Sequence, residues 1–81
     1  MQTKIQLRIN KSILDRVLDF CGFENFTPDG TEHYIVEYPF IENDYYYDML
    51  LSFGQACECL APTHIREELK RRAQAIAAIY E

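Results

Sequence analysis

Hydrophobic and polar residues alternate near the start of the chain, where Ile5, Leu7 and Ile9 are separated by polar residues. Successive side chains of a strand point to opposite faces, so this alternation predicts a half-buried strand over residues 4–9. Apolar residues then recur at intervals of three and four, which is typical of an amphipathic helix that packs on the strand and ends at Gly22. The residues of this apolar stripe are Leu14, Val17, Leu18 and Cys21.

A β-hairpin is predicted around Pro28-Asp29-Gly30, because proline restricts the chain at the turn and glycine supplies a positive φ. We expect its strands over residues 23–27 and 31–38, with the second ending at Pro39. On this second strand we assign one face to the core. That face carries Tyr34, Val36 and Tyr38, and the opposite, exposed face carries His33, Ile35 and Glu37.

The remaining residues predict a helix, a short strand and a second helix. The first helix covers residues 44–53, begins after the capping residue Asn43 and ends at Gly54, which can adopt the left-handed conformation. A strand over residues 56–60 follows, and Pro62 opens a helix over residues 63–80. The inward stripe of the first helix is Tyr46, Leu50 and Phe53, with Tyr47 and Leu51 beside it. That of the last helix is Ile65, Leu69, Ala73, Ile76 and Tyr80.

The order strand, helix, strand, strand, helix, strand, helix predicts an α+β fold. Two βαβ-like halves with right-handed crossovers give a ferredoxin-like split βαβ sandwich (βαββαβ) with an added C-terminal helix. The two crossover helices are expected to cover one face of the sheet. The other face is left to solvent, the extra helix or a partner. We expect residues 1–81 to form one domain.

Composition limits the function classes. No apolar run approaches the ~20 residues that span a bilayer, and an odd number of cysteines, 3, argues against a secreted disulfide framework, so a cytoplasmic location is expected. The net charge is −5, and residues 23–64 contain acidic residues but no Lys or Arg. Such a surface repels phosphate, so the domain is not expected to be the main reader of nucleic acid. A solvated acidic face is the simpler interpretation of this segment.

Candidate catalytic and metal-binding residues are few. Cys57 and Cys59 point to the same face of a strand, but a zinc site needs two further ligands, from His33, His64 or Cys21. Small apolar residues on a buried face are the favoured interpretation of the cysteines. Neither histidine has a nucleophile at a recognisable spacing, and there is no glycine-rich phosphate loop. We therefore assign no catalytic residue, no metal site and no cofactor, and expect no enzymatic activity.

Two further groups of residues are candidates for binding. Tyr45-Tyr46-Tyr47 point in three directions on a helix, so core or interface packing is favoured over a ligand pocket. We place Tyr45 and Tyr47, together with the exposed sheet face, on an interface or ligand surface. The basic side chains of the last helix are interpreted as a solvated helix face, and weak contact with nucleic acid is the alternative. These side chains are Arg66, Lys70 and Arg71.

The segment Leu51-Ser52-Phe53-Gly54, followed by Cys59-Leu60-Ala61-Pro62 and Ile65-Arg66-Glu67-Glu68-Leu69, resembles the end of the WYL C-terminal extension (WCX) domain. The first strand, the helix over residues 13–20, the turn at Asp29-Gly30 and the aromatic strand after it match the start of that domain. The resemblance covers nearly all of residues 4–80. Cys59 stands where an aliphatic residue such as Val is usual in the family, which supports a core position.

The resemblance implies a role in transcription regulation. WCX domains close bacterial WYL-domain regulators, which carry an N-terminal winged helix-turn-helix that binds DNA and a central WYL domain thought to sense a ligand or nucleic acid. The extension is associated with dimerisation and regulation and has a ferredoxin-like fold. We therefore expect a regulatory and dimerisation module, with a homodimer as its form and DNA bound through an upstream domain. The start at Met1-Gln2-Thr3 favours a domain taken from a longer protein. The alternative is a domain that senses a small-molecule or nucleotide effector.

Overall fold

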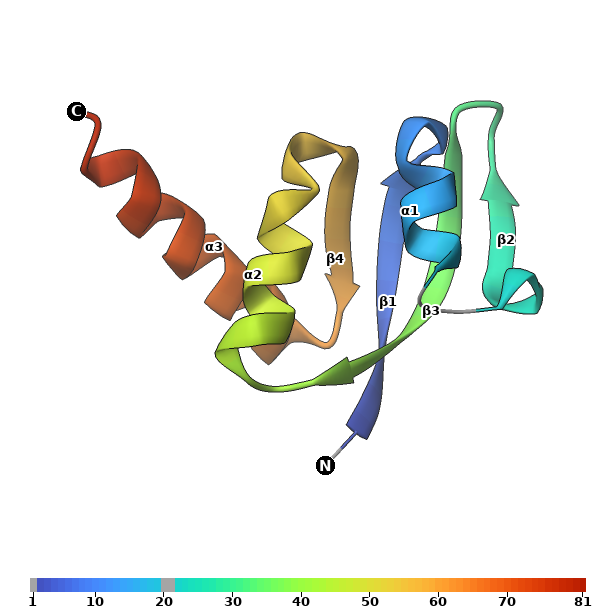
Figure 1. Cartoon of the computed structure of the whole chain (residues 1–81), viewed down its shortest axis with the longest axis horizontal. Coiled ribbons are helices and arrows are strands. Elements are labelled where there is room, and N and C mark those ends of the chain that lie inside the picture. The colour runs from blue at the N-terminus through green and yellow to red at the C-terminus, as the bar shows by residue number, and fades with distance from the viewer. Residues whose placement is uncertain (1, 20–21) are drawn as a thin grey trace.

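The computed structural model describes residues 2–19 and 22–81 and has an α+β architecture, with one four-stranded antiparallel sheet and three helices (Figure 1). Cys21, predicted to end the stripe of the first helix and considered as a zinc ligand, lies outside the described residues. The elements are β1 (Gln2–Asn10), α1 (Leu14–Leu18), β2 (Phe26–Asp29), β3 (His33–Ile41), α2 (Asp44–Ser52), β4 (Cys57–Ala61) and α3 (Thr63–Ala78). Short 3-10 turns cover Lys11–Ile13, Phe23–Asn25 and Gly54–Ala56.

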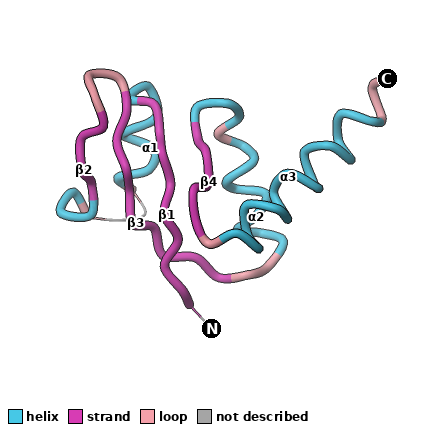
Figure 2. Tube along the Cα trace, turned by 180° about the vertical axis from the view of Figure 1, so that it is seen from behind, coloured by secondary structure: helices cyan, strands magenta, loops and turns pink. Residues whose placement is uncertain are grey.

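The strands lie in the order β2-β3-β1-β4, and each neighbouring pair is antiparallel. The long central pair is in continuous register from Gln2 opposite Ile41 to Asn10 opposite His33. β2 and β4 are the two edge strands (Figure 2). Each helix that connects two strands, α1 or α2, joins strands that are not neighbours in the sheet.

The core lies between one face of the sheet and the connecting helices α1 and α2, as predicted. Arg16 of α1 also stacks on the ring of Phe53 at the end of α2, 4.8 Å from its centroid, and so links the two helices. The buried side chains that form the core are Ile5, Leu7, Ile9, Ile13, Val17, Val36, Tyr38, Phe40, Tyr47, Leu50, Phe53, Cys59 and Ile65. The alternation of β1 and β3 therefore predicts the buried face of the sheet correctly.

Local signals at the ends of the elements are also confirmed. The Asn43 side chain accepts a hydrogen bond from the backbone N–H of Tyr46 at 2.9 Å, which caps α2. Gly54 ends that helix with φ +62°, and Gly30 forms the hairpin turn with φ +76°. Both values lie in the left-handed region, where a side chain would be strained.

Several predicted boundaries are wrong. The strand predicted over residues 23–27 begins only at Phe26, after a 3-10 turn, and the last helix ends at Ala78 rather than at residue 80. Two other boundaries are wrong because the sheet tolerates its prolines at edges. β3 continues through Pro39 to Ile41 instead of ending there. β2 reaches only as far as Phe26 opposite Val36, so β3 has one neighbouring strand at Pro39, and a missing N–H costs little. Pro28 likewise lies inside the edge strand β2 rather than in the turn. In the described part of the chain, no helix has the length and apolar character that crossing a membrane requires.

Candidate functional site

The face of the sheet opposite the core is polar, and it carries the predicted surface residues of β3. His33 and Ile35 are half-buried and Glu37 is exposed. Arg8 on β1 donates to Asp29 on β2 at 2.7 Å, so this ion pair bridges across β3. An exposed pair of this kind stabilises the fold by no more than about 1 kcal/mol, but it adds charged groups to the face beside Ile35, which is opposite Arg8 in the register. The predicted residues thus share one surface, which is largely hydrophilic.

The three tyrosines of α2 have different environments. Tyr45 is 68% exposed, whereas Tyr47 is buried and packs edge-on against Phe40 at 5.1 Å between ring centroids. Tyr46 is half-buried and also packs edge-on against the Phe40 ring, at 5.7 Å between ring centroids. The prediction that Tyr47 lies on an interface surface is therefore corrected: the helix turns this residue, and not Tyr46, into the core. Burial first, and then the nearby carboxylates of Glu42 and Glu68, raise the pKa of Tyr47.

In the described chain, the main contacts of helix α3 with the rest of the domain come from residues between Ile65 and Arg72. Ile65 is fully buried and Leu69 is half-buried. Arg72 then reaches α2, where its guanidinium donates to Asp44 at 2.8 Å and lies 4.4 Å from the centroid of the Tyr47 ring. The same side chain donates to Glu68 at 2.7 Å, as the i, i+4 spacing of these two residues predicts.

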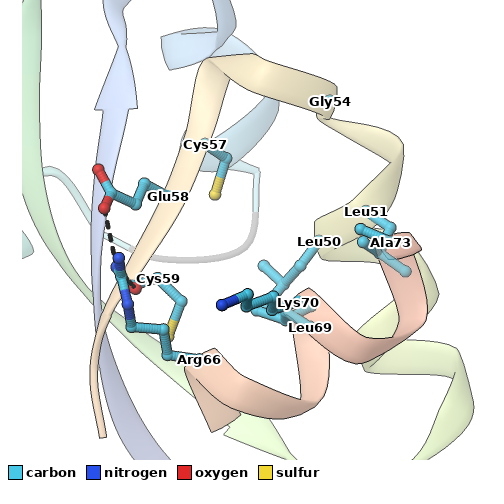
Figure 3. Close-up of a pocket in the computed structure, with 10 residues that line it drawn as sticks. All are labelled: Leu50, Leu51, Gly54, Cys57, Glu58, Cys59, Arg66, Leu69, Lys70 and Ala73. Carbon is cyan, nitrogen blue, oxygen red and sulfur yellow. Dashed lines mark hydrogen bonds and ion pairs between the residues drawn. The ribbon is translucent and has the colours of Figure 1, made fainter. Parts of the chain in front are cut away.

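The basic residues considered for nucleic-acid contact divide into two kinds. Arg66 donates to Glu58 at 2.8 Å and to the carbonyl oxygen of Cys59 at 2.9 Å, so it caps the outer edge of β4. Arg71 donates twice to Glu68. Hydrogen bonds from Arg71 and then Arg72 lower the pKa of Glu68 to about 2. These arginines are engaged with protein acceptors, whereas the Lys70 side chain extends into a groove beside β4 (Figure 3).

This groove lies between α2, β4 and α3 and has a volume of about 300 Å³. Its lining is mostly apolar, with charged groups at the rim. The lining residues are Leu50, Leu51, Gly54, Cys57, Glu58, Cys59, Arg66, Leu69, Lys70 and Ala73. In Figure 3 the leucines of α2 and α3 lie on the side of the groove opposite β4, and the Arg66–Glu58 ion pair closes the side at β4. A groove of this size and character can hold a bulky apolar side chain or a small ligand.

The cysteines in the groove are not arranged for chemistry. Burial raises the pKa of the Cys57 thiol to about 12, with smaller effects from Cys59 and Glu58, so the reactive thiolate is disfavoured at neutral pH. Cys59 is buried in the core. Among residues 2–19 and 22–81, no group of His, Cys, Asp and Glu side chains converges on a metal position. His64 is exposed and contacts the Glu42 carboxylate.

The second half of α3 and the turn that follows it form an apolar surface that has no cover within the described chain. Ile76 is 50% exposed, Ile79 72% and Tyr80 83%. The helix projects away from the sheet and the other helices, with the C-terminal end at the extremity of the molecule (Figures 1 and 2). The stripe of α3 predicted to face inward therefore does so only at Ile65 and Leu69. The signal in the sequence was the absence of any charged residue from position 73 to position 80.

Comparison with known proteins agrees with this architecture. The family model of the WCX domain matches residues 2–77, which is nearly the whole chain. No curated protein and no solved structure matches it. The WCX domain is the C-terminal extension of WYL-domain proteins, which is consistent with a regulatory module. The match spans β1 to the last turn of α3, including both the groove and the start of the exposed apolar surface, and we conclude that the chain belongs to the WCX domain family.

Proposed function

We propose that this domain is the C-terminal regulatory and dimerisation module of a bacterial transcriptional regulator that binds DNA through an upstream helix-turn-helix domain. It acts in the cytoplasm and has no enzymatic activity of its own. The strand order β2-β3-β1-β4, with helices that connect non-neighbouring strands, supports the ferredoxin-like description of such a module. Its role is to hold two protomers so that two DNA-binding heads meet two half-sites.

The observation that carries this proposal is the exposed apolar end of α3. Monomeric proteins rarely expose a contiguous apolar patch of this kind, and such patches mark interaction sites. Here Ile76 lies on α3, and Ile79 and Tyr80 lie in the turn after it, where the chain already stands clear of the core. Membership in the WCX family supports the proposal, because such C-terminal extensions belong to multidomain regulators.

Sedimentation equilibrium over a wide concentration range tests dimerisation. We expect the mean mass to rise with concentration from that of the monomer toward twice that value. A mass that stays at the monomer value throughout would contradict the proposal. Fluorescence anisotropy with a labelled DNA duplex at low salt tests the expected absence of strong DNA binding. A salt-dependent affinity that is lost in an Arg66→Ala, Lys70→Ala variant would instead assign the basic residues of α3 to nucleic acid.

The groove favours a second function, the sensing of a small-molecule effector. Its apolar lining with the Lys70 ammonium at the rim would suit a ligand that combines an apolar body with an anionic group. Thermal-shift screening against metabolites and nucleotides separates the two functions. A ligand that raises the melting temperature of the domain, but not that of a Lys70→Ala variant, would support sensing. Association without any ligand-induced shift would support dimerisation.

A further inference from the structure

Residues 73–80, at the exposed end of α3 and in the turn after it, differ in composition from a helix that remains in solvent. Residues 73–80 contain three types of apolar side chain, one glutamine and no charge. A helix surface that stays in water normally carries charged residues on its outer face. The half that packs on the domain is, by contrast, rich in charged residues, with Arg66, Lys70 and Arg72 among them. The apolar stripe is therefore suited to a protein surface that the described chain does not supply.

The spacing of this stripe is self-complementary. Leu69, Ala73 and Ile76 of α3 and Tyr80 of the turn that directly follows it are spaced at intervals of four, three and four residues. The pattern is therefore the same in both directions along the chain. When two such helices run antiparallel about a two-fold axis between positions 74 and 75, Ile76 of each lies over Ala73 of the other. Tyr80 of each then lies over Leu69. Each large side chain faces a smaller one, which is the condition for close interdigitation.

The groove lies where this pairing would place a tyrosine. Leu69 and Ala73 belong both to the stripe and to the lining of the groove, and Leu51 of α2 lies beside Ala73 in this lining (Figure 3). A tyrosine arriving over Leu69 would bury its ring against these residues and bring its hydroxyl to the Lys70 ammonium at the rim. A buried tyrosine ring with a partner for its hydroxyl is a frequent anchor of protein interfaces.

We propose that the partner of the exposed end of α3 is a second copy of this chain, bound through an antiparallel α3–α3 pair in which Tyr80 of each copy enters the groove of the other. This inference rests on the proposed dimerisation and names the surface that performs it. The paired segment spans residues 69–80, which are the end of α3 and the turn after Ala78, and it is about 17 Å long at a helical rise of ~1.5 Å per residue. Such a contact is at the small end of specific interfaces, so the domain alone associates weakly and reversibly.

This surface differs from the one that the sequence favoured. His33, Ile35 and Glu37 lie on a face that the Arg8–Asp29 ion pair partly covers, and that face offers no apolar patch comparable to the end of α3. Tyr45 is exposed at 68% but lies on α2, outside the groove lining.

A photo-crosslinking residue at position 80 tests the geometry directly. Benzoylphenylalanine in place of Tyr80 keeps an aromatic side chain and reacts with nearby C–H bonds, so it does not depend on the poorly ionised thiols of the groove. The matched control carries the same residue in place of Tyr45, which is exposed to a similar degree on another helix. We expect a covalent dimer only from position 80, with its attachment in the peptides that contain Leu50, Leu51 or Leu69 of the second copy.

The outcomes separate this inference from the proposed function. A domain that dimerises in solution but gives its crosslinks from position 45, or from position 80 to peptides outside the groove, would overturn the α3 pairing and leave dimerisation standing. A domain that stays monomeric at every concentration would overturn both.

A pair of substitutions in the same helix provides the second test. Ile76→Glu places two carboxylates in the proposed contact, because a symmetric dimer contains each substitution twice, and we expect the dissociation constant to rise roughly 100-fold. Ala78→Glu, on the opposite face of α3, adds the same charge outside the contact and should change the dissociation constant by less than about 3-fold. Both positions are exposed, so both variants remain folded. Equal effects of the two variants would overturn the assignment of the face.

Discussion

One buried and one exposed isoleucine of α3 give a matched test of how the helix is attached to the rest of the domain. Ile65 is fully buried, whereas Ile76, eleven positions later in the same helix, is 50% exposed. Replacing Ile65 by alanine removes three carbon groups from the core, a loss of about 2.4 kcal/mol at ~0.8 kcal/mol per group. The cavity left behind adds to this, so we expect a total of about 3–4 kcal/mol. That is a large share of the roughly 4–12 kcal/mol expected for a domain of 81 residues.

The same substitution at Ile76 should cost less than about 1 kcal/mol, because half of the side chain is already in water and alanine favours the helix slightly more. Chemical denaturation followed by far-ultraviolet circular dichroism measures both values, since the chain has no tryptophan. Protein concentrations below the association range keep the measurement on the monomer. Similar costs at the two positions, or a cost below about 1 kcal/mol at Ile65, would refute the view that only the first half of α3 belongs to the core.

Three further predictions concern a cap and two titrating groups. Asn43→Ala removes the cap of α2 and should lower the free energy of unfolding by about 1 kcal/mol, with Asn43→Asp close to the original protein in chemical denaturation. Hydrogen bonds from Arg71 and Arg72 hold the pKa of Glu68 at about 2, below its ordinary value of 4.5. The ionised carboxylate therefore stabilises the fold fully above pH 4.5 and progressively less as the pH falls toward 2. The Glu68→Gln variant should therefore be less stable than the unchanged protein at neutral pH and equally stable near pH 2. A difference in the free energy of unfolding that stays constant across this pH range would contradict the stabilising role of the Glu68 carboxylate. Burial raises the pKa of the Cys57 thiol from its ordinary value of 9 to about 12. The neutral thiol therefore contributes fully to stability below pH 9, and this contribution is lost as the pH rises toward 12. Cys57→Ala should reduce this alkaline loss of stability, and in the folded protein Cys57 should react more slowly with a thiol reagent than in denaturant.

Patterns that depend on the chain alone were sufficient for most of the fold. The alternation of Ile5, Leu7 and Ile9, the cap at Asn43 and the positive φ at Gly54 are each decided by a few neighbouring residues. The errors occurred where a more distant part of the chain decides the outcome. Pro39 remains in its strand because β2 is too short to reach it, and the length of β2 cannot be read from the residues around Pro39.

The tyrosines of α2 illustrate the same limit on a smaller scale. Periodicity placed Tyr46, Leu50 and Phe53 in one stripe, but a helix stripe is broad enough to be centred one residue further on. The Phe40 ring, added to the core by the continuation of β3 past Pro39, packs against both Tyr46 and Tyr47. Arg72 covers the outer side of Tyr47 from α3. The identity of the buried tyrosine was therefore set by two elements that lie outside the helix.

The periodic stripe of α3 shows what such a pattern does and does not determine. Apolar spacing predicts that one face of a helix avoids water, but it is silent on whether the cover comes from the same chain or from a partner. In this domain the cover from the same chain ends after Leu69, and the Arg72 contacts with Asp44 and Tyr47 fix the direction in which the helix continues. Because a helix transmits its direction rigidly, the anchors between Ile65 and Arg72 also set the angle at which the end of the helix meets another molecule. In the proposed dimer, the core residue Ile65 and the ion pairs of Arg72 would therefore control how two protomers, and the DNA-binding heads attached to them, are oriented.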